Sequence, residues 1–139
     1  MKELNFDTRL VNYSINGKCE VAFNPTDSAF VEKLFNAFDV LDKKQESYKE
    51  EVEKTANKRE VFETARKMDE EMRDIINDVF CFNICGELFG EMNVYALADG
   101  MPVWANLMLA IMDEVDTTFA REQKATNTRI SKYTKKYHR

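Results

Sequence analysis

The chain has 139 residues, of which 44% are apolar and 32% are charged, and its formal net charge is −5. This length favours one domain, and the apolar fraction is sufficient for one hydrophobic core without disulfides or metals. Only four glycines are present, which argues against an all-β fold rich in turns. The longest apolar run, residues 107–112, is too short to span a bilayer. We therefore predict a single α-rich domain over residues 1–120.

The charges are unevenly distributed along the chain. Residues 121–139 carry seven lysines or arginines against one acid, a net charge of +6, so the first 120 residues carry −11. The basic residues of this predicted C-terminal tail include Arg121, Lys124, Arg129, Lys132, Lys135 and Lys136. The tail is either a helical extension or a disordered end in solvent, or it contacts an acidic partner or another copy of the chain.

Residues 9–23 predict a β-hairpin around the turn signal Asn16-Gly17. Apolar residues alternate on both arms: Val11, Tyr13 and Ile15, then Cys19, Val21 and Phe23. A two-residue loop would pair Ile15 with Lys18 and put the two apolar sets on opposite faces. A three-residue loop, residues 15–17, pairs Tyr13 with Cys19 and puts both sets on one face, so we predict this register.

Residues 26–85 contain neither proline nor glycine, and their apolar residues recur every three or four positions, which predicts long helices. Asn24 is the predicted N-cap and Pro25 the first helical residue. Two apolar stripes follow each other out of phase, the first ending at Val52 and the second beginning at Val61. The phase jump indicates either a turn near residues 55–57, giving an antiparallel helical hairpin, or one long helix with a stutter. One helix over this whole range would be about 90 Å long, which favours the hairpin.

The second helix is predicted to end near Cys85, because Gly86 supplies a C-terminal stop. Residues 87–101 are too apolar for a solvated loop, so we predict a connector with a short helix that packs on the core. Pro102 then opens a C-terminal core helix. Residues 107–112 are apolar on every side of that helix, so it is either covered on several sides or presents one face to a partner.

The sequence shows no catalytic, cofactor or metal pattern. The single histidine, His138, is penultimate, which argues against histidine acid–base chemistry. Cys81 and Cys85 share a helical face but lack the further ligands that structural zinc requires. Neither a phosphate loop nor a nucleophile elbow is present. We therefore predict no enzymatic activity, no cofactor and no metal. Three cysteines without a signal peptide predict a reducing, cytoplasmic location.

A set of methionines and aromatics after residue 86 is the candidate partner-binding site, because adaptable Met-rich surfaces accept varied helical partners. Its members are Phe89, Met92, Tyr95, Trp104, Met108 and Met112. The alternative is that these residues form ordinary core. The tail sequence over residues 132–137 interleaves bases with aromatics, a pattern that can bind single-stranded nucleic acid. The acidic body argues against that partner.

The order of these features resembles the tail assembly chaperones of long-tailed phages that infect Gram-positive bacteria. The resemblance is carried by Ile15-Asn16-Gly17-Lys18, Val21-Ala22-Phe23-Asn24-Pro25, the Phe-rich helix, the charged helical middle, Leu88-Phe89-Gly90 and Lys132-Tyr133-Thr134-Lys135-Lys136-Tyr137. It implies a mostly helical protein in the bacterial host cytoplasm without catalytic residues. The family role would be to coat the apolar tape measure protein and recruit tail tube subunits.

Three further possibilities stay open at this point. The chain could be a phage-encoded regulatory or counter-defence module that binds a host protein. It could bind nucleic acid weakly through the basic tail. Self-association into a homo-oligomer is compatible with each of these functions.

Overall fold

The computed structural model of the chain describes residues 1–124. These residues form four helices and two small hairpins, which confirms the predicted mainly α fold with an N-terminal β-hairpin. The elements in chain order are β1 (Val11–Ile15), β2 (Cys19–Phe23), α1 (Ser28–Lys54), α2 (Lys58–Phe80), α3 (Ile84–Phe89), β3 (Leu97–Ala98), β4 (Met101–Pro102) and α4 (Val103–Lys124).

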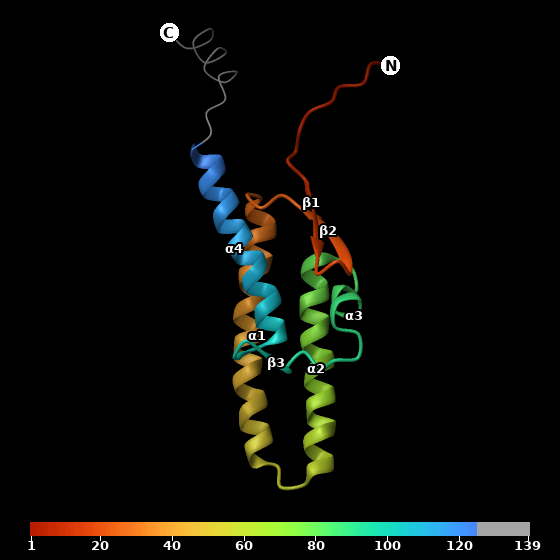
Figure 1. Cartoon of the computed structure of the whole chain (residues 1–139), viewed down its shortest axis with the longest axis vertical. Helices are drawn as coiled ribbons and strands as arrows, with labels where there is room; N and C mark the ends of the chain where they lie inside the picture. The colour runs from red at the N-terminus through yellow and green to blue at the C-terminus, as the bar shows by residue number, and fades with distance from the viewer. Residues whose placement is uncertain (125–139) are drawn as a thin grey trace.

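Helices α1 and α2 run antiparallel as one long helical hairpin (Figure 1). The turn lies at residues 55–57, which confirms the helical hairpin over one continuous helix. Thr55 closes α1, with its backbone N–H donating to the Val52 carbonyl at 3.3 Å. Asn57 opens α2, where its side chain accepts from the Arg59 N–H at 2.9 Å. Two caps separated by a single residue, Ala56, explain why the apolar stripes change phase here.

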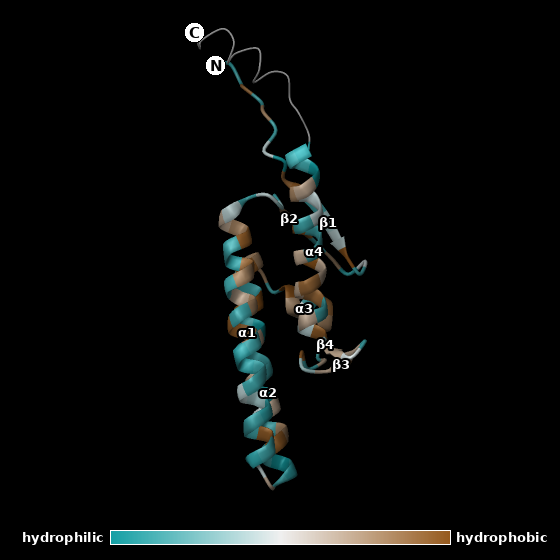
Figure 2. Ribbon diagram, turned by 90° about the vertical axis from the view of Figure 1, so that its left-hand side faces the viewer, coloured by the Kyte–Doolittle hydropathy of each residue, from teal (hydrophilic) through white to brown (hydrophobic). Residues whose placement is uncertain are grey.

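The remaining elements cover only the upper part of this helical hairpin (Figure 1). Helix α4 lies beside α1, while β1, β2 and α3 lie near the C-terminal end of α2. The lower part of α1 and α2 extends beyond them as a two-helix arm, which Figure 2 colours mainly as hydrophilic. The core is therefore built from one side of each long helix. Its fully buried members include Leu34, Leu41, Met72, Ile76, Ile84, Val94 and Met108.

The N-terminal hairpin forms as predicted, but its register differs. Ile15 pairs with Cys19 and Tyr13 with Val21, so the three loop residues are 16–18 instead of 15–17. Asn16 and Gly17 both adopt positive φ, at 53° and 66°, and the Lys18 N–H donates to the Ile15 carbonyl at 3.0 Å. Lys18 is thus an extra residue after a tight Asn-Gly turn. It keeps both apolar sets on one face, as the prediction required.

Two predicted helix ends are wrong. Helix α1 is capped by Asp27, whose side chain accepts from the Ala29 N–H at 3.0 Å, and Asn24 instead closes a turn through its contact with the Thr26 N–H at 2.8 Å. Helix α2 ends at Phe80 because Cys81 adopts a left-handed conformation, with φ of 62°. The predicted stop residue, Gly86, lies inside α3.

The predicted short helix is present as α3, but it begins at Ile84, before the predicted connector, and overlaps it only at residues 87–89. Residues 87–101 pack on the core, as predicted, through Leu88, Val94 and Tyr95. The connector also contains a hairpin, β3–β4, that we did not predict. Its strands have two residues each, and its turn residues Asp99 and Gly100 have φ of 55° and 77°. Pro102 lies in β4, and α4 begins one residue later, at Val103. In residues 1–124, no helix combines the length and apolar character needed to cross a membrane.

Candidate peptide-binding groove

An apolar concave surface lies between α4 and the tip of the N-terminal hairpin. It consists of two cavities of about 350 and 240 Å³ that share Ile15, Asn16, Leu107 and Ala110. The larger cavity is also lined by Lys18, Leu88, Phe89, Met92, Ala98, Val103 and Asn106. The smaller one is also lined by Tyr13, Ser14, Val21, Phe23, Ile111 and Glu114. Because they adjoin, we treat them as one feature, the α4 groove.

The residues of α4 that line this groove are spaced so that they fall on one side of the helix. Val103, Leu107, Ala110 and Glu114 follow one another at three or four residues, so they lie along one side of the helix. Ala110 is exposed, and its small side chain leaves room between α4 and the hairpin tip. A larger side chain at this position would project into the groove.

Aromatic stacking and one long hydrogen bond hold the hairpin over the groove. The Tyr13 ring stacks on Phe23 with a centroid separation of 4.6 Å, and Phe23 stacks on Phe30 of α1 at 4.4 Å. At the tip, the Lys18 ammonium donates to the Leu88 carbonyl at 3.3 Å. The hairpin is therefore attached to both α1 and α3, which keeps the groove open.

Polar groups gather at the end of the groove nearest the α4 C-terminus. The Thr118 hydroxyl donates to the Glu114 carboxylate at 2.8 Å. Burial, and then the negative charge of Glu114, raises the pKa of the nearby Tyr13 hydroxyl above its ordinary value. The Arg9 guanidinium pairs with Glu122 at 3.4 Å, which ties the segment before β1 to α4. The groove thus combines an apolar floor with a carboxylate at one end.

The structure divides the six residues that we predicted as the partner-binding site. Phe89 and Met92 line the larger cavity, and Met92 is 53% exposed. Met112 is half-buried and packs against the core. The other three, Tyr95, Trp104 and Met108, are only 8%, 2% and 0% exposed. They are core residues, so the prediction that they form a partner-binding surface is wrong.

Specific contacts explain why two of these large residues are core. The Trp104 indole N–H donates to the Gln45 side-chain oxygen at 2.9 Å, which accounts for a polar residue within the apolar stripe of α1. The Tyr95 ring stacks on Tyr48 with a centroid separation of 4.1 Å. Its hydroxyl is buried without a hydrogen-bond partner, and burial raises its pKa.

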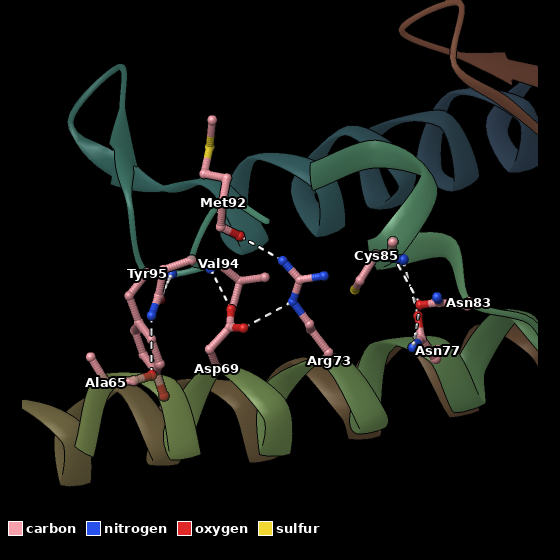
Figure 3. Close-up of polar contacts among 11 residues, drawn as sticks. Ala65, Asp69, Arg73, Asn77, Asn83, Cys85, Met92, Val94 and Tyr95 are labelled. Carbon is pink, nitrogen blue, oxygen red and sulfur yellow. Dashed lines mark hydrogen bonds and ion pairs between the residues drawn. The ribbon is translucent and has the colours of Figure 1, made fainter. Parts of the chain in front are cut away.

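An ion pair on α2 fixes the connector that carries Met92 (Figure 3). Asp69 and Arg73 pair at 3.0 Å, and each side chain is only 16% exposed. Arg73 also donates to the Met92 carbonyl at 2.6 Å, and Asp69 accepts from the Val94 N–H at 2.7 Å. Both charges therefore hold connector backbone as well as each other. This Asp69–Arg73 pair positions the lower edge of the groove.

A second polar cluster, at the end of α2, positions α3 (Figure 3). The Asn77 side chain accepts from the Cys85 N–H at 3.0 Å and donates to the Asn83 side-chain oxygen, also at 3.0 Å. Asn83 caps α3 by accepting from the Gly86 N–H at 3.1 Å. Burial raises the pKa of the Cys85 thiol to about 12. These contacts fix the helix that places Leu88 and Phe89 in the groove.

Sequence reasoning missed most of the groove, because its two sides come from distant parts of the chain. Ile15 and Asn16 were assigned to a hairpin without a position relative to α4. Val103 and Leu107 were assigned only to the predicted C-terminal core helix. The one usable signal was Ala110, a small residue within an apolar stretch.

The basic residues of the predicted tail are only partly described. Arg121 and Lys124 lie exposed at the end of α4. Arg129, Lys132, Lys135 and Lys136 lie outside the described residues. At the other terminus, the segment before β1 exposes Leu4 and Phe6 almost completely, at 88% and 84%.

Within residues 1–124, no group of three or more His, Cys, Asp or Glu side chains is arranged to hold a metal ion. Comparison of the chain with protein-family models, with curated proteins and with solved structures found no match.

Proposed function

We propose that this chain is a non-catalytic binding protein that holds an apolar helical segment of another chain in the α4 groove. The observation that supports this proposal best is the groove itself, which has a mainly apolar lining between α4 and a hairpin that contacts both α1 and α3. The larger cavity, at about 350 Å³, falls within the range of roughly 300–1,000 Å³ that is usual for ligand pockets. The partly exposed lining residues Ile15, Phe89 and Met92 offer apolar surface to side chains of a partner.

A helix is the form of partner that suits this shape. The lining residues of α4 run from Val103 to Glu114, about 17 Å along the helix, which gives a wall of about three turns. An amphipathic helix can place side chains at i, i+3, i+4 and i+7 into such a groove. The exposed Met92 thioether at the lower edge can adapt to different side-chain shapes.

The resemblance to phage tail assembly chaperones suggests the client. We propose that it is an apolar helical segment of a tape measure protein, which must stay covered until the tail tube closes around it. Recruitment of tail tube subunits would then use other surfaces. The almost fully exposed Leu4 and Phe6 are accessible to such a second contact.

Co-purification with co-expressed tape measure fragments tests this proposal. Ala110→Arg adds a long charged side chain in the middle of the groove, at an exposed helical position where arginine is well tolerated. We expect it to weaken retention of the fragment at least tenfold. Ala56→Arg, at the exposed tip of the two-helix arm, makes the same chemical change far from the groove and should leave retention unchanged.

Circular dichroism and thermal unfolding should confirm that both variants fold. Substitution of Trp104 or Met108 is unsuitable for this purpose, because both are core residues and their truncation would destabilise the protein by about 2–5 kcal/mol. Equal retention of the fragment by the wild type and by a folded Ala110→Arg variant would exclude the α4 groove as the client site.

A further inference from the structure

The part of the chain that forms one wall of the α4 groove is strongly acidic. Residues 72–120 contain eight acids and a single base, Arg73, which is engaged with Asp69 and the Met92 carbonyl. The acids beside the groove are Glu114, which lines it, and the exposed residues Glu91, Asp99 and Asp113, which adjoin lining residues in sequence. An occupant that carries positive charge would therefore be favoured.

Two cations lie on or near the hairpin side of the groove. Lys18 donates to the Leu88 carbonyl, and Arg9 pairs with Glu122. The Arg9 contact neutralises Glu122 on α4, and the Lys18 ammonium keeps its charge because its partner is a neutral carbonyl. Neither contact involves Glu91, Asp99, Asp113 or Glu114. The groove thus has an apolar floor, acids on the side of α4 and the connector, and one lysine, Lys18, at the hairpin tip.

Residues 125–139 have the complementary chemistry. They contain five lysines or arginines and no acid. Ile130, Tyr133 and Tyr137 recur among these basic residues at spacings of three and four. This end of the chain therefore pairs apolar side chains with positive charge, as an occupant of the groove requires.

The length of this segment is sufficient to reach the groove of the same molecule. Helix α4 ends at Lys124, and Ala110 lies fourteen residues earlier, a distance of about 21 Å along the helix. Fifteen residues span up to about 50 Å when extended and about 22 Å when helical. Attachment to α4 also gives the segment an effective concentration in the millimolar range, so a weak contact is enough.

We propose that residues 125–139 occupy the α4 groove of their own chain in the free protein, as a substitute for the client segment. This inference rests on the proposed function, because it takes the groove to be a binding site for another chain. It also specifies the client class: an apolar helical segment with basic residues, which displaces the C-terminal segment on binding.

Zero-length coupling with a carbodiimide tests the contact on the full chain without any client. Equal amounts of ¹⁴N- and ¹⁵N-labelled protein are mixed, coupled and analysed by mass spectrometry. We expect Lys132, Lys135 and Lys136 to couple mainly to Glu91, Asp113 or Glu114 of chains with the same label. Adding 0.5 M NaCl should lower the yield at least threefold, because the contact is electrostatic.

Substitutions on the groove make the coupling test specific. Ala110→Arg should lower the yield at least fivefold, whereas Ala56→Arg should not change it. Couplings spread equally over the acids of the two-helix arm, such as Glu50 and Glu63, would overturn the proposal. Predominant coupling between differently labelled chains would overturn it as well, because the contact would then join two molecules.

A variant that alters only the C-terminal segment gives a second, independent measurement. Lys132→Glu, Lys135→Glu and Lys136→Glu together should speed hydrogen exchange of the groove backbone over residues 103–114 in the free protein. The same variant should retain a basic apolar tape measure fragment at least threefold more strongly than the wild type. Unchanged exchange would count against the proposal. If the C-terminal lysines couple to the groove acids but no tape measure fragment is retained, the proposed function is refuted and the intramolecular contact stands.

Discussion

Replacement of Arg73 by methionine should destabilise the protein by about 2–4 kcal/mol. The arginine makes a 3.0 Å ion pair with Asp69 and a 2.6 Å hydrogen bond to the Met92 carbonyl, and both partners of the pair are only 16% exposed. Hydrogen bonds that involve charged groups contribute about 1.5–3 kcal/mol each. Methionine keeps most of the apolar volume of the arginine side chain. The decrease in the free energy of unfolding therefore measures the loss of the polar contacts. Part of the cost is the Asp69 carboxylate, which is left without its cation.

The assay is urea unfolding followed by circular dichroism, applied to a double-mutant cycle with Asp69→Asn. The asparagine keeps an oxygen that can accept from the Val94 N–H, so the cycle isolates the ion pair. We expect a coupling free energy of about 1–2 kcal/mol between the two positions. Hydrogen exchange of residues 92–95 should speed up in both single variants, because the connector loses its attachment to α2.

The control is Lys49→Met, which breaks an exposed pair with Glu46 at 4.0 Å. Pairs of that kind contribute about 0–1 kcal/mol, so this variant should stay within about 0.5 kcal/mol of the wild type. A loss below about 0.5 kcal/mol for Arg73→Met, or no coupling to Asp69, would show that the connector does not depend on this pair.

Two further predictions concern the cluster that positions α3. Gly86→Ala would put a Cβ 2.4 Å from the Asn83 side-chain nitrogen, so it should cost about 1–2 kcal/mol in urea unfolding by displacing the α3 cap. In an Asn83→Ala background the same substitution should cost little, and an equal cost there would point to another clash. Burial raises the pKa of Cys85 from 9 to about 12, so unfolding releases its proton above pH 9 and stability falls as the pH rises. We expect a loss of about 1.4 kcal/mol per pH unit between pH 9 and 12 from this thiol, and Cys85→Ala should remove that part of the slope.

The sequence predicted the parts of the fold that depend on local patterns. The out-of-phase stripes around residues 55–57 indicated the helical hairpin, because a continuous helix cannot present both stripes to one core. Asn16-Gly17 indicated the β-turn, because both residues tolerate positive φ. The hairpin register was missed by two residues because nothing local distinguishes an extra Lys18 from an extra Ile15 when both keep the apolar sets together.

Features that depend on side-chain contacts between distant residues could not be predicted. Cys81 ends α2 in a left-handed conformation that cysteine rarely prefers, and Asn77 and Asn83 then open α3. With these contacts unknown, Gly86 was the only visible stop signal. Trp104 looked like a surface anchor because its partner, Gln45, lies 59 residues away. The candidate groove was missed for the same reason, since it exists only where the hairpin tip meets α4.

The two-helix arm offers a practical site for engineering. The exposed Ala56 lies between the residue that closes α1 and the residue that opens α2, so an insertion beside it would leave both caps in place. The arm projects away from α4 and the N-terminal hairpin (Figure 1). A fluorescent tag or affinity peptide inserted there would report on the protein in cells while leaving both chain termini unmodified.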